Sequence, residues 1–541
     1  GALPDGNNVA LAIIPSTFTA TVTADTANAY TGKVQVNGGT LAVGTENYLG
    51  TAPGAAVADA ITLDGGTLQL TNTLTLNANR GVTLGMSGGT FSVNPNMSLT
   101  YAGIIAGTGG LTKSGSGTMT LSGASTYSGG ATISAGTLKV GIASVGSVGA
   151  VTSGALGTGT TTVASGAALD LNGMTIPNAM SVAGTGISSG GSLFNTAATA
   201  ASVTGPITLS ANSTFISTPG LTLGTINGGL YALTVTASTA AGTGDITLNG
   251  PVTFSGENIS TFTASRNINI NNTITVNGTT SASGIVLKFS QGATNSGDYN
   301  FGLTASGAGV GMTASFAGSI NFANTASTFS TQNYTAAAKS YTLVDSFTTA
   351  VPSTSTFYCV TTTHCGGSNA VNFALAGDIN ATGFTAANMR AVGPTNNVGY
   401  AGIFEGLGHK INNLTLSGSG NVALFQSTAA NAEIRNLRLS AANISGGSYT
   451  GALVANTSSS LKITNVVLDS TSSVTGGSSD NVGGLVGRAN GGGSFTNVYV
   501  LGTSVNGGGY VGGVAGYTTM SATNVHKVGN VTATGSTVGG A

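Results

Sequence analysis

Two cysteines and a histidine form the tightest group of residues that could bind a metal or form a cross-link. Cys359 and Cys365 are the two cysteines of the chain, and His364 stands beside the second. Two thiolates and one imidazole supply three of the four ligands of a tetrahedral zinc site, and no carboxylate or further histidine is near in sequence. We therefore expect a local disulfide that closes a small loop, with free thiols as the second interpretation and a metal site as the least favoured.

The densest group of ionisable side chains is Glu405, His409 and Lys410. A carboxyl group beside an imidazole could exchange protons in acid–base catalysis. We favour a solvated turn with a hydrogen-bonded histidine.

The stretch Gly186–Gly190 fits the Gly-x-Ser-x-Gly pattern of a serine nucleophile. In a chain with 87 glycines, such a match is expected by chance, and the strand-to-helix turn that the motif requires is not predicted.

Acidic and aromatic residues are spread along the chain. Enzymes that cleave polysaccharides need carboxylates that converge on one face, whereas these acids fall in different predicted coils: Asp64, Asp170, Asp245, Asp345, Asp378, Asp469 and Asp480. We therefore predict no enzymatic activity, no catalytic residue, no cofactor and no metal.

Several tyrosines could stack on sugars if they lined one face of the protein. We favour structural roles for them at strand ends. These tyrosines are Tyr30, Tyr48, Tyr101, Tyr127, Tyr499, Tyr510 and Tyr517.

The composition restricts the fold that could position these residues. Only 14 Lys and Arg and 15 Asp and Glu occur in 541 residues, whereas 40% of the chain is hydrophobic. Such a chain is too apolar and too weakly charged to be disordered. Glycine disrupts helices, while the abundant Thr, Val, Ser and Asn favour strands and turns. A net charge of −1 gives no field that would attract nucleic acid. The sequence therefore predicts an all-β protein with no nucleic-acid partner.

Two families of repeated phrases indicate a solenoid. In the N-terminal third, a phrase of the type Gly-Gly-Thr-Leu opens successive alternating strands, as at 38–41, 65–68, 88–91, 109–112 and 135–138. In the C-terminal part, an Asn phrase such as Ile434–Leu439 alternates with a glycine phrase such as Val482–Gly487. Repeats of 20–50 residues are typical of solenoids, in which each coil bonds to its neighbours. We predict a rod with the fold of a right-handed parallel β-helix (β-solenoid).

The Asn phrase does not fit a regular strand. Strict alternation would turn Ile434 and Asn436 inward and expose Leu437 and Leu439. A bend at Asn436 would reset the alternation, so that all three apolar residues face the core. Asn tolerates left-handed backbone, and its amide can donate and accept along a stack. We therefore predict a column of structural asparagines, one per coil: Asn413, Asn436, Asn465, Asn497 and Asn524.

Several stretches resemble those of known secreted proteins. Gly109–Gly123, continued by Tyr127–Gly130 and Gly136–Leu138, closely matches the passenger-associated strand repeat of bacterial autotransporters. Residues 264–276 and 404–414 resemble exoproteins of the filamentous-haemagglutinin type, which use two-partner secretion. The glycine phrases resemble the GLUG motif of such proteins.

This resemblance implies a secreted or cell-surface adhesin that is exported through an outer-membrane translocation barrel. We expect a structural rod that mediates attachment, aggregation or biofilm contacts with glycans or proteins of host, bacterial or matrix surfaces. The alternatives are a filament or sheath subunit that self-associates end to end and, more weakly, a polysaccharide-active enzyme. By repeat type we expect four segments: β-helix with passenger-associated repeats (1–177), less regular exoprotein-type β-helix (178–345), a transition with the cysteine loop (346–400), and β-helix with GLUG-type repeats and the Asn column (401–541).

Overall fold

The computed structural model describes residues 9–13, 19–21, 31–239, 242–292, 297–334, 336–346, 370–384, 399–478, 481–535 and 537–539. Within these ranges the chain is built of β-strands and turns, and its only helices are short 3-10 segments: η1 (Glu46–Leu49), η2 (Ile187–Ser189) and η3 (Gly309–Gly311). Parallel pairing dominates. The prediction of an all-β parallel β-solenoid is therefore confirmed. Cys359 and Cys365 lie outside the described residues, so their disulfide stays a prediction.

The chain divides into two compact units. Unit 1 comprises residues 1–268, 287–298 and 333–335, and unit 2 comprises residues 269–286, 299–332 and 336–541. The division falls near three strands, β31 (Ile268–Ile270), β33 (Gly284–Lys288) and β34 (Tyr299–Asn300). Our four segments follow repeat type instead, and they stay a prediction.

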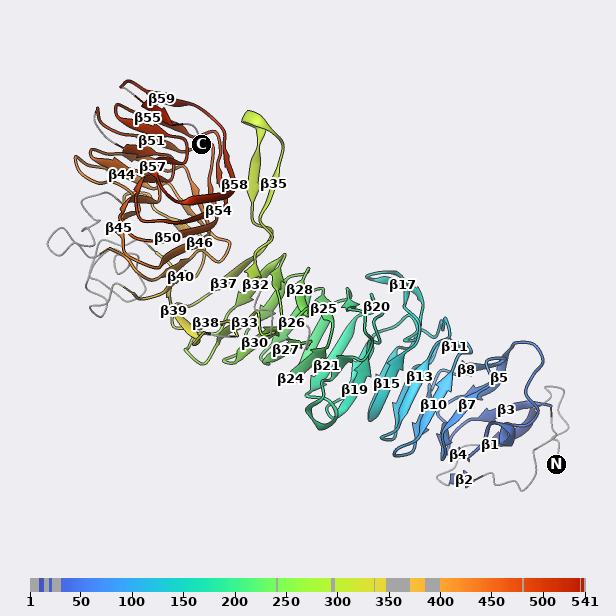
Figure 1. Ribbon diagram of the computed structural model, residues 1–541. Coiled ribbons are helices and arrows are strands. Elements are labelled where there is room, and N and C mark those ends of the chain that lie inside the picture. Colours follow the sequence, from blue (N-terminus) through green and yellow to red (C-terminus); the bar gives the residue numbers. More distant parts are fainter. Residues whose placement is uncertain are drawn as a thin grey trace. The chain divides into compact units, whose positions relative to one another are not determined.

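Most coils of unit 1 contribute three short strands, which stack on the equivalent strands of the next coil (Figure 1, blue to green). The first stack is β2 (Thr19–Thr21), β4 (Thr40–Val43), β6 (Thr67–Leu70), β9 (Gly89–Val93), β12 (Leu111–Ser114), β14 (Ala131–Ile133), β18 (Thr161–Val163), β21 (Met180–Gly184), β24 (Ile207–Ser217), β26 (Ile226–Gly229) and β29 (Val252–Phe254).

The other two positions of each coil build further parallel stacks. One is β7 (Leu74–Leu76), β10 (Ser98–Tyr101), β13 (Thr118–Leu121), β15 (Gly136–Val140), β19 (Ala167–Asp170), β22 (Leu193–Asn195), the second half of β24, β27 (Leu233–Ala237) and β30 (Ile259–Ala264). The third position gives two separate stacks. The first is β1 (Val9–Ile13), β3 (Lys33–Val36), β5 (Val57–Leu63), β8 (Arg80–Leu84) and β11 (Ile105–Gly107). The second includes β20 (Thr175–Ile176), β23 (Ala201–Val203), β25 (Gly220–Leu223) and β28 (Asp245–Leu248).

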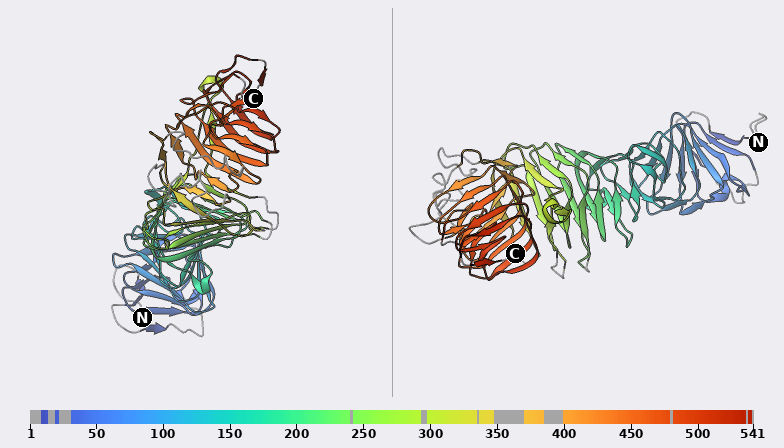
Figure 2. Two further views of the ribbon diagram at one scale, coloured as in Figure 1. Left: turned by 90° about the vertical axis from the view of Figure 1, so that its left-hand side faces the viewer. Right: turned by 90° about the horizontal axis from the view of Figure 1, so that it is seen from above.

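Unit 2 is also built from stacked coils (Figure 2). It opens with the pair β32 (Thr273–Val276) and β37 (Ser319–Phe322), and β38 (Thr328–Gln332) lies antiparallel to β39. The main stack is β39 (Lys339–Val344), β40 (Phe373–Leu375), β42 (Ile403–Glu405), β46 (Ala432–Ser440), β50 (Leu461–Leu468), β54 (Gly493–Val500) and β58 (Ser521–Lys527). Two shorter strands precede the second half of β46: β41 (Ile379–Asn380) pairs with β43 (Lys410–Asn412), and β43 pairs with β46.

Three further stacks complete the coils of unit 2. They are β44 (Thr415–Ser417), β47 (Asn443–Ser445), β51 (Ser473–Thr475), β55 (Ser504–Gly507) and β59 (Val531–Ala533); β45 (Phe425–Thr428), β49 (Val454–Thr457), β53 (Val486–Ala489) and β57 (Ala515–Thr518); and β48 (Tyr449–Thr450), β52 (Asn481–Gly483), β56 (Tyr510–Gly512) and β60 (Thr537–Gly539). Two antiparallel hairpins lie outside the stacks, β16 (Val145–Ser147) with β17 (Ala150–Ser153) and β35 (Thr304–Ser306) with β36 (Thr313–Ser315).

The alternation of each strand separates an apolar core from a polar surface. In the first stack of unit 1, one inward column contains Leu68, Phe91 and Ile133, all buried. The outward residues that precede them are Thr67, Thr90 and Thr132, which are exposed or half-buried. Because successive coils are in register, each side-chain type forms a column along the stack.

Candidate functional site

Four asparagines form a hydrogen-bonded column through unit 2. Asn436, Asn465, Asn497 and Asn524 occupy equivalent positions of β46, β50, β54 and β58, and each has a left-handed backbone, with φ between 53° and 55°. The amide of Asn465 donates to Asn436 Oδ1 at 2.8 Å, that of Asn497 to Asn465 at 2.9 Å, and that of Asn524 to Asn497 at 2.7 Å. Each amide thus links its coil to the coil before.

The left-handed residue also resets the alternation of the strand. Ile434, Leu437 and Leu439 are all fully buried, although a regular strand would expose the two leucines. Asn436 adopts the backbone that permits this with less strain than most residues. The position of the bend therefore determines which side chains reach the core.

Asn413 lies outside this column, contrary to the sequence-based expectation. Ile411 pairs with Leu439, not with Ile434, so Asn413 falls one corner later in the coil. There it also has a left-handed backbone, with φ of 59°, but its amide donates to Asn380 Oδ1 at 3.1 Å. The phrase similarity misaligned these coils because one coil can have two left-handed corners, at Asn436 and at Ala441 in the case of β46.

A buried carboxyl group takes the place of a fifth asparagine at the base of the column. Glu405 has no exposed surface, and its Oε2 accepts from Asn436 Nδ2 at 3.1 Å and from the Tyr299 hydroxyl at 2.6 Å. Its Oε1 accepts from the Leu407 backbone amide at 2.8 Å, and Arg435 Nε lies 3.4 Å from Oε2. Burial raises the pKa of Glu405 to about 7, although Arg435 and these donors act to lower it.

This carboxylate gives the column a direction. When ionised it can only accept hydrogen bonds, so Asn436 must turn its NH2 group toward Glu405 and its oxygen toward the next coil. Every later amide then donates in the same sense, and the Asn524 oxygen faces His526 Nε2 at 2.8 Å. Aligned amides polarise one another, which strengthens the bonds of the column.

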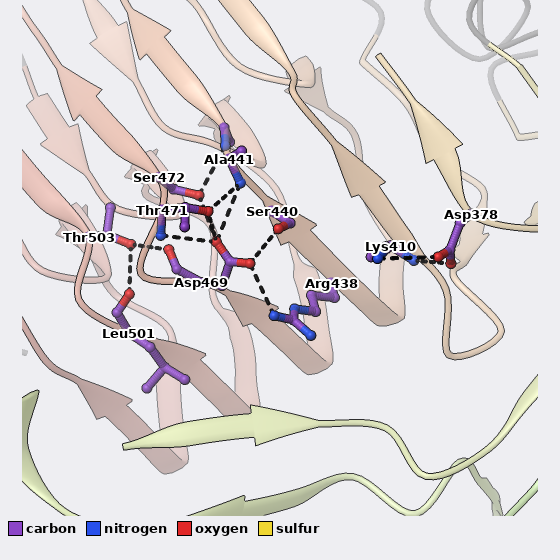
Figure 3. Close-up of polar contacts among 11 residues, drawn as sticks. Asp378, Lys410, Arg438, Ser440, Ala441, Asp469, Thr471, Ser472, Leu501 and Thr503 are labelled. Carbon is purple, nitrogen blue, oxygen red and sulfur yellow. Dashed lines mark hydrogen bonds and ion pairs between the residues drawn. The ribbon is translucent and has the colours of Figure 1, made fainter. Parts of the chain in front are cut away.

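His409 and Lys410 belong to a neighbouring corner that is less solvated than we expected. His409 is buried, with Nε2 2.8 Å from the Ile320 carbonyl oxygen and Nδ1 3.3 Å from Asp378 Oδ1. Figure 3 shows Asp378 also contacting Lys410, whose backbone nitrogen donates to Oδ1 at 3.1 Å. The His409 bond is the main influence that holds the pKa of Asp378 below its usual value. These contacts hold the corner between the neighbouring coils together.

Asp469 is a second structural carboxylate, which the sequence did not distinguish from the other acids. Figure 3 shows its side chain at the corner that follows β50, facing Arg438, Ser440 and Thr471. The Thr471 hydroxyl donates at 2.7 Å and Arg438 Nη2 at 3.1 Å. Burial alone would raise the pKa of Asp469, but the bonds from Ser440 and Thr471 outweigh it and hold the pKa low. Asp469 therefore fixes the corner between two coils.

Lys113 is an unexpected charge in the apolar inward column of unit 1. It pairs with Phe91 on one side and Ile133 on the other, and it is fully buried. Its ammonium donates to the carbonyl oxygens of Ser114, Gly115 and Ala135 at 2.8 to 3.1 Å. Burial lowers the pKa of Lys113 to about 8. The side chain therefore caps the carbonyls of a corner from inside the coil.

The remaining candidate residues do not gather into a catalytic site. Tyr101, Tyr127 and Tyr499 are buried, Tyr48 is half-buried, Tyr510 and Tyr517 are exposed, and Tyr30 lies outside the described residues. Within the described ranges, no three His, Cys, Asp or Glu side chains form a group that could hold a metal, and no helix could span a membrane. Asp170 pairs with Lys139 and Asp245 with Arg266, each across neighbouring coils.

Known proteins resemble parts of this chain. The passenger-associated-transport-repeat family matches residues 19–43 and 111–140, and the second stretch contains Lys113. The chain is 36% identical to the adhesin BmaC autotransporter of Brucella suis biovar 1 (strain 1330) over an alignment of 90 residues. The aligned residues cover 17% of this chain and 2% of that protein. No solved structure matches the chain. The likeness to two-partner exoproteins and to the GLUG motif stays a prediction. The two matches indicate a secreted or cell-surface protein similar to autotransporter passengers.

Proposed function

We propose that this chain is the adhesive part of a surface-displayed passenger and that it acts by contact, without catalysis. The observation that carries the proposal is a column of outward hydroxyl groups on the first stack of unit 1. In register from coil to coil, it comprises Thr40, Thr67, Thr90, Thr112, Thr132, Thr162, Ser181 and Thr208. Such a surface offers many weak polar contacts that salt barely screens.

Two further features support this proposal. The repeat match includes Thr40, Thr112 and Thr132 of the hydroxyl column, and the relative that aligns over 90 residues is named an adhesin. The ionisable groups described above are used within the fold, as the Glu405 and Asp469 contacts illustrate. Export through an outer-membrane barrel, of the autotransporter or two-partner type, and attachment to glycans or proteins of other surfaces belong to the same proposal.

Beads coated with the purified chain test this function. We expect them to stay attached to bacterial or animal cells under flow at higher shear than albumin-coated beads, while a polysaccharide panel releases no new reducing ends. Retention no better than that of albumin on every surface would contradict adhesion. Sugar release would favour the enzyme, and regular polymers under negative stain would favour a filament subunit.

A further inference from the structure

The glycine phrases of unit 2 bring two columns of outward side chains together. Gly487 and Gly516 lie where β53 and β57 pass close to the strands of the preceding coil. A Cβ atom at Gly487 would lie 2.6 Å from the Thr450 backbone nitrogen, and one at Gly516 would lie 2.6 Å from that of Val482. Only glycine permits this approach, which places the residue after each glycine beside β48 or β52.

The two columns carry aromatic and polar side chains. Tyr449, Asn481 and Tyr510 are the outward residues of β48, β52 and β56, and they are in register. Asn456, Arg488 and Tyr517 are the corresponding residues of β49, β53 and β57. Tyr510 is 54% exposed and Tyr517 is 41% exposed. We call these six residues the tyrosine patch.

Arg488 is held in place within the tyrosine patch. Its Nη1 donates to the Tyr449 hydroxyl at 3.2 Å, and its guanidinium carbon lies 5.5 Å from the centre of the Tyr449 ring. A guanidinium has five N–H groups in a planar fork that matches a carboxylate. A fixed fork loses less entropy when it binds a carboxylate than a mobile side chain does.

We propose that the tyrosine patch binds a glycan that carries carboxylate groups, such as a uronic-acid oligosaccharide. The exposed tyrosine rings would stack on the apolar faces of the sugars, and Arg488 would pair with a carboxylate. None of the six residues is acidic, which favours an anionic ligand. A single cation is too few for nucleic acid, whose binding needs many phosphate contacts. This inference rests on the proposed adhesive function, for which it names a partner class and a site.

Binding of oligogalacturonate to the full chain, measured by titration calorimetry, tests the proposal. We expect Arg488→Gln and Tyr517→Ala each to weaken binding at least tenfold. Tyr334→Ala is the matched control, because Tyr334 is 59% exposed and lies outside the patch. It should bind like the unmodified chain. Circular dichroism should show that all variants keep the fold.

Three results would overturn the proposal. They are no binding of oligogalacturonate, equal binding by Arg488→Gln, and equal binding of a neutral oligosaccharide of the same length. The bead assay separates this failure from that of the broader function. If beads attach to cells but the variants bind oligogalacturonate unchanged, the site is rejected while adhesion stands. If no beads attach, adhesion itself fails.

Discussion

At the scale of single residues, the buried polar groups of the Asn column are tolerated because each has a partner in a neighbouring coil. Asn436 and Glu405 are both fully buried, and each would be costly if left without a hydrogen bond. The column supplies those bonds in one continuous chain from Glu405 to Asn524. Removing one member therefore leaves two neighbours unsatisfied.

Asn465→Ala should destabilise the coils around it by about 2–3 kcal/mol, because two buried bonds are lost and alanine is strained at a left-handed position. Asn524→Ala is the matched control: its φ of 53° is nearly the same as the 54° of Asn465, but its side chain is exposed. We expect a cost of about 1 kcal/mol there, since water can replace the lost bond. Hydrogen exchange of β50 and β54 measures both values, and equal costs would contradict the column.

The buried carboxyl group predicts a pH dependence of stability. The folded chain keeps the Glu405 proton up to about pH 7, whereas an ordinary glutamate loses it near pH 4.5. The contribution of Glu405 to the free energy of unfolding is therefore largest below pH 4.5, and it falls by up to about 3 kcal/mol as the pH rises to 7. Urea unfolding at pH 5 and pH 8 measures this change. Glu405→Gln should remove most of this dependence of the unfolding free energy on pH. If the unfolding free energy of the variant changes as much between pH 5 and pH 8 as that of the unmodified chain, another group is responsible.

At the scale of elements, the repeat phrases predicted that the chain forms coils, but they did not always predict which residues of neighbouring coils are paired. The bend at Asn436 and the burial of Leu437 followed from a conflict between alternation and hydrophobicity that is visible in one phrase. Asn413 was misaligned, because a short phrase does not reveal which of two similar corners it occupies. The contact of Glu405 with Tyr299 joins residues 106 positions apart, and no local pattern indicates such a pair. Arg488 was missed for the same reason, since Tyr449 reaches it from another coil.

The glycine phrase makes a prediction about packing between strands. Gly487→Ala should destabilise β48 and β53 by about 2–3 kcal/mol, because the new Cβ would collide with backbone that cannot move aside. Gly420→Ala is the control, since a Cβ there would meet no atom within 4 Å. Thermal unfolding should leave the control near the unmodified chain. Equal midpoints for the two variants would mean that the close approach at Gly487 is absent.

At the scale of the whole molecule, the account depends on successive coils that stack in register within each unit. The hydroxyl column of unit 1, the Asn column of unit 2 and the tyrosine patch all exist because equivalent residues of neighbouring coils are adjacent. Adjacent parallel strands lie about 4.8 Å apart, within the range of Cα separations that a disulfide bridges. Engineered cysteines can therefore report the register directly.

The most direct measurement is disulfide formation by cysteine pairs in a chain with Cys359 and Cys365 replaced by serine. Thr132 faces Thr162 in unit 1, and Lys462 faces Ser494 in unit 2. We predict that Thr132→Cys with Thr162→Cys, and Lys462→Cys with Ser494→Cys, oxidise readily. Partners moved two residues along the strand, Ala164→Cys and Thr496→Cys, lie about 8 Å away and should stay reduced. Equal oxidation of in-register and displaced pairs would contradict the stacked coils.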